Sequence, residues 1–217
     1  MSQKESGFKI TVFASGTGSN FKSIVDAIDD GTLKAEVAGV ISNNPDAGAI
    51  EFAKNRCFNW AIVNKKRYPD TEEHDNKLMS LLQEWKTDLI VLAGYMKKIP
   101  TGIVAKFKNK ILNIHPALLP SFGGKGMYGM RVHETVIDYG VKYSGVTVHL
   151  VDNEFDSGPI VLQQTVPVFD DDTPEKLQKR ILIEEHKIYK KAIQLFAENR
   201  IEISGRRVIA KRDHAGN

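Results

Sequence analysis

The sequence predicts an α/β fold: a mostly parallel, Rossmann-like open sheet with helices on both faces and an antiparallel strand pair near its C-terminal side. From residue 8 onwards, short apolar runs alternate with longer amphipathic segments, as in strands joined by crossover helices. The runs are rich in Val, Ile and Leu, which is typical of strands buried on both faces of a parallel sheet. The predicted strands of this set are residues 8–14, 37–41, 61–63, 89–93 and 111–114.

The amphipathic segments between these runs predict the crossover helices. In the third segment, Asp70 stands three residues before Glu73, which is a helix start signal. Thr173 and Pro174 predict the cap and first turn of a long helix near the C-terminus. The predicted helices are residues 20–29, 47–55, 71–85, 102–107 and 174–199.

Two further strand-like runs, residues 144–150 and 160–168, are separated only by VDNEFDSGP. A link this short cannot hold a crossover helix, so these strands should pair antiparallel. The residues from Ile201 predict a small edge strand before a polar tail at about 210–217. No repeat or linker interrupts the chain, which predicts a single domain over residues 1–217 with its core at about 8–199.

The composition favours a globular protein of a reducing compartment. The 217 residues are 41% hydrophobic and 26% charged, with a net charge of +3 spread too thinly to favour a nucleic-acid partner. Cys57 is the one cysteine, and the longest apolar stretch, residues 89–96, is too short to span a membrane. The histidines lack metal-ligand spacing. We therefore expect a cytoplasmic monomer or homodimer with no membrane, nucleic-acid or metal partner.

A glycine loop follows the first predicted strand. Gly16 and Gly18 precede the helix that begins near Asn20, where backbone N–H groups and the helix N-terminus can bind an anion. Phe21 stands where a dinucleotide fingerprint has its third glycine, and no Walker lysine follows. The loop is suited to a phosphate or a carboxylate, and a single phosphate is the favoured ligand; a tight turn without a ligand is the alternative.

Asn113 and His115 lie two positions apart at the end of a predicted strand, so their side chains leave the same face. Pro116 ends the strand and leaves the pair at the carboxyl edge of the sheet, where open parallel sheets bind ligands. An amide and an imidazole suit acyl transfer, because they can stabilise the oxyanion of the transition state and transfer a proton. A structural histidine is the alternative.

Asp156, in the loop between the two antiparallel strands, is a candidate third group. The loop could lie over the same sheet edge as His115, and a nearby carboxylate raises the pKa of an imidazole and favours its charged form. His149, on the preceding strand, is a second candidate for the same pocket.

Four segments resemble, in order, the phosphoribosylglycinamide formyltransferase family of folate-dependent enzymes: SGTGSN, DLIVLAGYMKKI, ILNIHPALLP and GVTVHLVDNEFDSGPIVLQQTVPV. The resemblance extends from about Lys9 to residues 184–189. It implies transfer of a formyl group, in purine biosynthesis, from 10-formyltetrahydrofolate as cosubstrate to the amine of glycinamide ribonucleotide, without a metal. The products would be formylglycinamide ribonucleotide and tetrahydrofolate.

The resemblance also implies a role for each matching residue. The implied catalytic residues are Asn113, His115 and Asp156. Those that bind the substrate phosphate are Gly16, Thr17, Gly18, Ser19 and Asn20, and those that bind the rest of this substrate are Glu185 and His149. The implied folate-binding residues are Met96, Lys97, Lys98, Ile99, Asn113, Asp152, Asn153, Glu154, Phe155 and Asp156.

The chain departs from this family pattern at two places. Residues 121–133 form a longer loop than the family has, and Thr71 takes the aligned position of a folate-binding arginine, with Arg67 as the neighbouring candidate. Two alternatives are a formyltetrahydrofolate hydrolase of the same fold and a non-catalytic nucleotide-binding module. The length disfavours the hydrolase, and likewise an enzyme acting on methionyl-tRNA, because we expect each to carry an additional domain.

Overall fold

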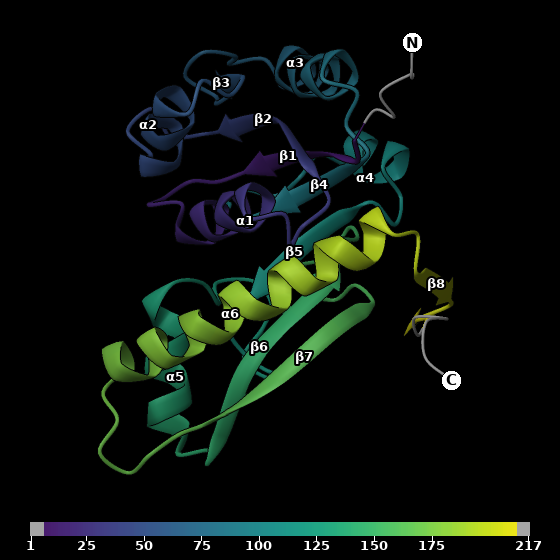
Figure 1. The fold of residues 1–217 in the computed structure, drawn as a ribbon. Coiled ribbons are helices and arrows are strands. Elements are labelled where there is room, and N and C mark those ends of the chain that lie inside the picture. The colour runs from purple at the N-terminus through teal and green to yellow at the C-terminus, as the bar shows by residue number, and fades with distance from the viewer. Residues whose placement is uncertain (1–6, 212–217) are drawn as a thin grey trace. The chain divides into compact units, whose positions relative to one another are not determined.

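The structure is a computed structural model that describes residues 7–211 (Figure 1). The chain divides into two compact units, and the boundary between them along the sequence falls after Ile103, in the short helix α4 (Thr101–Lys106). The last residues of the predicted polar tail, 212–217, lie outside the described residues. Within residues 7–211, no helix is long and apolar enough to cross a membrane.

The first unit contains a parallel sheet with strands in the order β3-β2-β1-β4. The chain steps in one direction from β1 to β3 and then returns to β4, so right-handed connections place α1 and α2 on one face and α3 on the other. The elements are β1 (Lys9–Phe13), α1 (Ser19–Asp29), β2 (Glu36–Ser42), α2 (Gly48–Asn55), β3 (Trp60–Ile62), α3 (Thr71–Glu84) and β4 (Leu89–Leu92).

Local contacts explain where α3 begins and how it packs. The carboxylate of Asp70 accepts a hydrogen bond from the N–H of Glu73 at 2.9 Å, which caps the helix as predicted. At its other end, Trp85 packs directly against β2, where a Cβ on Gly39 would lie 2.2 Å from the indole ring. Only a glycine leaves room for this contact.

The second unit is built on three antiparallel strands and a long helix. Strand β6 pairs with β5 on one side and with β7 on the other. The elements are β5 (Ile111–His115), α5 (Met130–Tyr139), β6 (Tyr143–Leu150), β7 (Ile160–Pro167), α6 (Pro174–Ala197), β8 (Ile201–Ser204) and β9 (Arg207–Ala210).

The predicted fold class is confirmed, and every predicted helix and strand up to residue 199 occurs with its ends within two residues of the expected ones. Two predictions were wrong. The expected loop at residues 121–133 ends in an unpredicted helix, α5, which begins at Met130. The residues from Ile201 form a hairpin, β8 and β9, with a sheet of its own instead of one edge strand. Whether the two units act as the single predicted domain stays a prediction.

Candidate functional site

The glycine loop of the first unit connects β1 to α1. Gly18 caps α1 with a left-handed backbone (φ +76), and a Cβ there would lie 2.9 Å from the Cβ of Ala49. The carbonyl oxygen of Gly16 accepts a hydrogen bond from the N–H of Ala49 at 3.2 Å. Gly16 and Thr17 are exposed. The structure therefore places a tightly held, accessible loop at a helix N-terminus, where an anion can bind.

The segment after β4 contacts this loop through Ser15. The N–H of Ser15 donates to the carbonyl oxygen of Gly94 at 3.1 Å, and its hydroxyl accepts the N–H of Met96 at 2.9 Å. Met96 and the two lysines after it are exposed, whereas the side chain of Ile99 is buried in the core. Two predicted ligand-binding segments are thus neighbours within the first unit.

The other residues that the resemblance assigns to substrate or folate binding lie in different surroundings. Arg67 is exposed in the turn before α3, and Glu185 is half-buried near the middle of α6. In the loop before β7, the carboxylate of Asp152 accepts the N–H of Glu154 and the hydroxyl of Ser157, each at 2.9 Å. The three exposed members of this loop are Asn153, Glu154 and Phe155.

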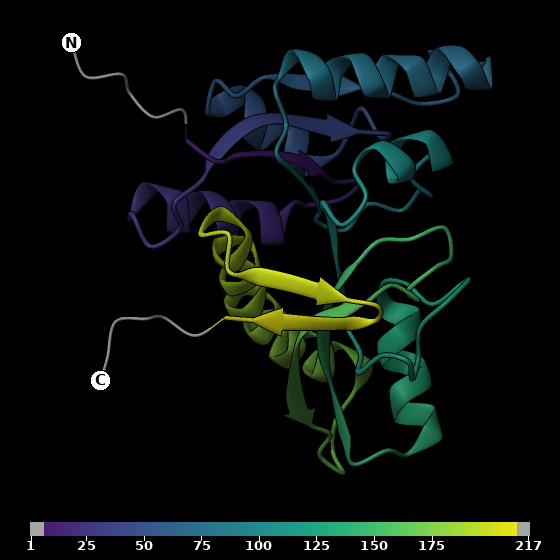
Figure 2. The same cartoon turned by 90° about the vertical axis from the view of Figure 1, so that its right-hand side faces the viewer.

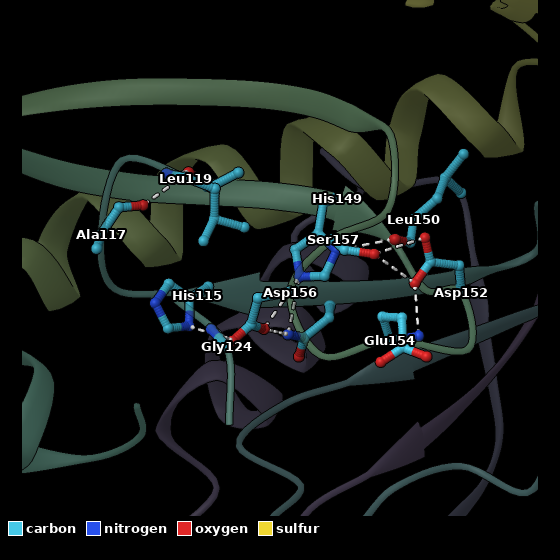
Figure 3. Close-up of polar contacts among 12 residues, drawn as sticks. His115, Ala117, Leu119, Gly124, His149, Leu150, Asp152, Glu154, Asp156 and Ser157 are labelled. Carbon is cyan, nitrogen blue, oxygen red and sulfur yellow. Dashed lines mark hydrogen bonds and ion pairs between the residues drawn. The ribbon is translucent and has the colours of Figure 1, made fainter. Parts of the chain in front are cut away.

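Asn113, His115, His149 and Asp156 form one cluster in the second unit, an arrangement that the sequence permitted. Figure 3 shows the side chains of His115, His149 and Asp156 in this cluster. Oδ1 of Asp156 lies 3.4 Å from the amide nitrogen of Asn113 and 3.5 Å from Nε2 of His149. Oδ2 lies 3.5 Å from Nδ1 of His115 and accepts the N–H of Gly124 at 2.9 Å. The side chains of His115, Asp156 and His149 are only 5%, 11% and 2% exposed.

Strand pairing and backbone carbonyls orient the two histidines. Asn113 on β5 lies directly opposite His149 on β6. Nδ1 of His149 lies 2.8 Å from the carbonyl oxygen of Leu150, and Nε2 of His115 lies 2.8 Å from that of Phe122. A carbonyl oxygen can only accept, so these two nitrogens carry protons. Nε2 of His149 lies 3.1 Å from the amide nitrogen of Asn113.

Burial and the neighbouring carboxylate have opposite effects on the pKa of His115. Desolvation lowers its pKa below 6.5, against the opposing effects of the Asp156 carboxylate and the Phe122 carbonyl. Asp156 does raise the pKa of His115, as predicted, but burial has the larger effect. The net change in the pKa of His115 is therefore opposite in direction to the change expected from the carboxylate alone.

Asp156 itself is ionised at neutral pH. Burial alone would raise the pKa of this carboxyl, but the hydrogen bond with His149, the charge of His115 and the N–H of Gly124 together lower it below 3.8. The cluster thus combines an anionic carboxylate, two imidazoles and an amide donor. Such a set can donate hydrogen bonds to a developing oxyanion and hold or release a proton. Within residues 7–211, no group of three or more His, Cys, Asp or Glu is arranged to hold a metal ion.

Sequence reasoning missed several parts of this cluster. Gly124 and Phe122 belong to the predicted loop at residues 121–133, but their contacts with Asp156 and His115 were not predicted. Only the glycines of this loop indicated a close approach of the backbone. Thr147 fixes the chain after His115: its hydroxyl donates to the carbonyl of Ala117 at 2.6 Å. Because Thr147 lies two residues before His149, strand alternation could have placed it on the same face.

His133 on α5 was also missed. It is 2% exposed, and its Nδ1 has no hydrogen-bond partner within the described part of the chain. Burial, together with the charge of His115, lowers the pKa of His133 to about 4. His133 is therefore a buried histidine that interacts electrostatically with His115 of the candidate site.

The chain is similar to known formyl-transferring enzymes over most of its length. A model of the formyl transferase family matches residues 8–193. The phosphoribosylglycinamide formyltransferase of Haemophilus influenzae is 40% identical over 195 residues, which cover 90% of each chain. The chloroplastic phosphoribosylglycinamide formyltransferase of Arabidopsis thaliana is 43% identical over 89% of this chain and 67% of the relative. The crystal structure of glycinamide ribonucleotide transformylase 1 from Symbiobacterium toebii has a TM-score of 0.88 and 41% identity, and 94% of each chain is covered.

Proposed function

Because the chain belongs to the formyl transferase family, we propose that it is an enzyme that transfers the formyl group of 10-formyltetrahydrofolate to the amine of glycinamide ribonucleotide. The observation that carries the proposal is the cluster of Asn113, His115 and Asp156 in a chain that is 40% identical to the phosphoribosylglycinamide formyltransferase of Haemophilus influenzae. In the reaction, the amine nitrogen bonds to the formyl carbon and the bond from this carbon to N10 of the folate breaks. One proton leaves the attacking amine, and one reaches N10.

We assign the stabilisation of the oxyanion to Asn113 and His115. The contact of 3.4 Å between the Asn113 amide and Asp156 is long, so this N–H can exchange its partner for the formyl oxygen. Nε2–H of His115 would have to leave the carbonyl of Phe122 to reach the substrate. As negative charge develops on the formyl oxygen, it raises the proton affinity of the imidazole, and ionised Asp156 stabilises the imidazolium that forms.

The remaining roles follow the family resemblance. Residues 16–20 would bind the substrate phosphate, Glu185 and His149 the rest of glycinamide ribonucleotide, and residues 96–99 and 152–156 the folate. The exposed loop and the helix N-terminus support the first role, because backbone N–H groups and the helix dipole at such a place favour an anion. Arg67 is the candidate for the folate carboxylate. A cytoplasmic location and a monomeric or homodimeric state also belong to this proposal.

The test is an assay of the purified protein with glycinamide ribonucleotide and 10-formyltetrahydrofolate. We expect formylglycinamide ribonucleotide and tetrahydrofolate to form in equal amounts. The matched control omits glycinamide ribonucleotide. Release of formate at the same rate in this control would instead support a hydrolase, and phosphate binding without turnover would support a non-catalytic module.

A further inference from the structure

One side chain of the C-terminal hairpin forms a hydrogen bond with the loop that carries Asp156. This hairpin, β8 and β9, is drawn as two yellow strands in Figure 2. At its turn, Nη2 of Arg206 donates to the carbonyl oxygen of Ser157 at 2.6 Å, across 49 residues of sequence. Ser157 directly follows Asp156, so the contact lies one residue from the central carboxylate of the candidate site.

The hairpin is fixed at both ends. At its base, the guanidinium of Arg200 donates to the carbonyl oxygen of Lys211 at 3.0 and 2.8 Å, and the N–H of Lys211 donates back to the carbonyl of Arg200 at 2.9 Å. At its tip, Ser204 pairs with Arg207 across a two-residue turn in which Gly205 has a φ of +57. Glycine with positive φ at this position is a preferred hairpin turn. The tip therefore presents Arg206 at a defined place.

The loop around Asp156 needs contacts to keep its conformation. Asp156 has a φ of +53, which few non-glycine residues adopt. From within the loop, the carboxylate of Asp152 accepts the hydroxyl of Ser157 and the N–H of Glu154. Gly158 then passes so close to Leu150 that a Cβ would lie 1.8 Å from its carbonyl oxygen. The hydrogen bond from Arg206 to the carbonyl oxygen of Ser157 holds the backbone between the Asp152 contacts and Gly158.

Arg206 also borders a cavity of about 360 Å³ beside the carboxylate. The other walls of the cavity include Leu119, Gly124, Phe155 and Asp156. Loss of the arginine side chain would remove one wall of this cavity and the outer contact of the loop together.

We propose that Arg206 is a positioning residue for formyl transfer, which holds the loop at Ser157 so that Asp156 stays against Asn113 and His115. The kinetic part of this proposal rests on the proposed function. The positional part rests on the hairpin contact alone and can be measured without substrate.

The direct readout is the NMR titration of His115. The titratable groups coupled electrostatically to its ring are Asp156 from the loop, His149 from β6 and His133 from α5. Asp156 raises the pKa of His115, and the charge of His149 lowers it. In Arg206→Ala, displacement of Asp156 should move the titration midpoint of His115 to lower pH. Loss of one hydrogen bond from a charged donor predicts a fall of about tenfold in kcat/KM.

Two further variants give the test its controls. Arg206→Lys keeps a cationic donor and should restore most of both effects. Arg207→Ala should change neither, because this neighbouring side chain is exposed and makes no hydrogen bond or ion pair within residues 7–211. Should Arg206→Ala fold poorly, Arg206→Met keeps the apolar stem and takes its place in both measurements.

The outcomes separate the two proposals. A wild-type midpoint of His115 in folded Arg206→Ala or Arg206→Met would overturn the positioning role. If the wild-type protein instead shows no formyl transfer, the proposed function fails, while the titration still decides whether Arg206 holds Asp156 in place.

Discussion

A single carboxylate organises the candidate site. Asp156 is 11% exposed, and a buried charge is costly unless hydrogen-bond donors surround it. The amide of Asn113, the N–H of Gly124 and two imidazoles surround this carboxylate. Since the side chain of asparagine has nearly the same shape as that of aspartate, Asp156→Asn removes the charge while changing the packing little.

We expect Asp156→Asn to lower kcat by about 100-fold or more, in the range typical of a lost acid–base group. The physical reason is that the variant cannot stabilise an imidazolium at His115 during transfer. Initial rates at saturating substrate measure the effect, and thermal melts show whether the variant is folded. A wild-type rate at neutral pH in the folded variant would contradict the assigned role.

The same substitution should change the titration of His115. In the wild-type protein we expect a midpoint below 6.5, because burial dominates, and a still lower midpoint in Asp156→Asn, because the carboxylate that raises the pKa is gone. Histidine NMR signals followed against pH measure both values. The signal of His74, on α3 in the first unit, is the internal control. An unchanged or higher midpoint for His115 would show that Asp156 does not act on this ring.

At the scale of elements, the connection between β1 and α1 depends on Gly18. In Gly18→Ala, the new methyl group would meet Ala49 at 2.9 Å on a left-handed backbone. We expect the free energy of unfolding to fall by about 1–2 kcal/mol. We also expect a higher KM for glycinamide ribonucleotide, because the proposed phosphate loop moves. Urea unfolding and steady-state kinetics measure the two effects.

Gly102→Ala is the matched control for this prediction. Gly102 lies in α4, and a Cβ there would meet nothing within 4 Å. Alanine in a helix should raise the free energy of unfolding by about 0.5–1 kcal/mol. The two glycine substitutions should therefore have opposite signs, and a neutral Gly18→Ala would contradict the steric explanation.

Helix α5 shows why one element could not be predicted from its pattern. Its three buried residues are Val132, His133 and Val136, so a histidine interrupts the apolar face. Its N-cap, Gly129, makes no side-chain hydrogen bond to the first turn, and no start signal stands there. Gly140, which has a φ of +75 at the C-terminal end of α5, is the sequence feature that could have indicated where this helix ends.

At the scale of the whole molecule, strand periodicity was enough to predict that Asn113 and His115 share a face. The position of Asp156 was predicted only as a permitted arrangement, because it depends on the register that places Asn113 opposite His149. The contacts of Gly124 and Arg206 with this loop join segments 32 and 49 residues apart. A local sequence pattern cannot predict such contacts, because they form between loops that are far apart in the sequence.

The stability of the whole chain depends on pH. His133, the buried histidine of α5, contributes to this dependence. The pKa of His133 is about 4 in the folded protein, against 6.5 for an unperturbed histidine. Between these values the unfolded chain binds a proton that the folded chain does not bind. The contribution of His133 is therefore fully present above pH 6.5 and is lost as the pH falls towards 4. Its size over this window is about 3 kcal/mol.

We accordingly expect the free energy of unfolding to fall as the pH is lowered from about 7 to about 4.5, and His133→Leu to reduce this slope without abolishing it. The remaining slope comes from His115, whose pKa is also lowered by burial. Urea unfolding at several pH values measures the slope. Val132→Ala, a fully buried apolar neighbour on the same helix, should lower stability equally at every pH. An equal slope in His133→Leu and wild type would mean that His133 is protonated in the folded protein, contrary to the burial that lowers its pKa.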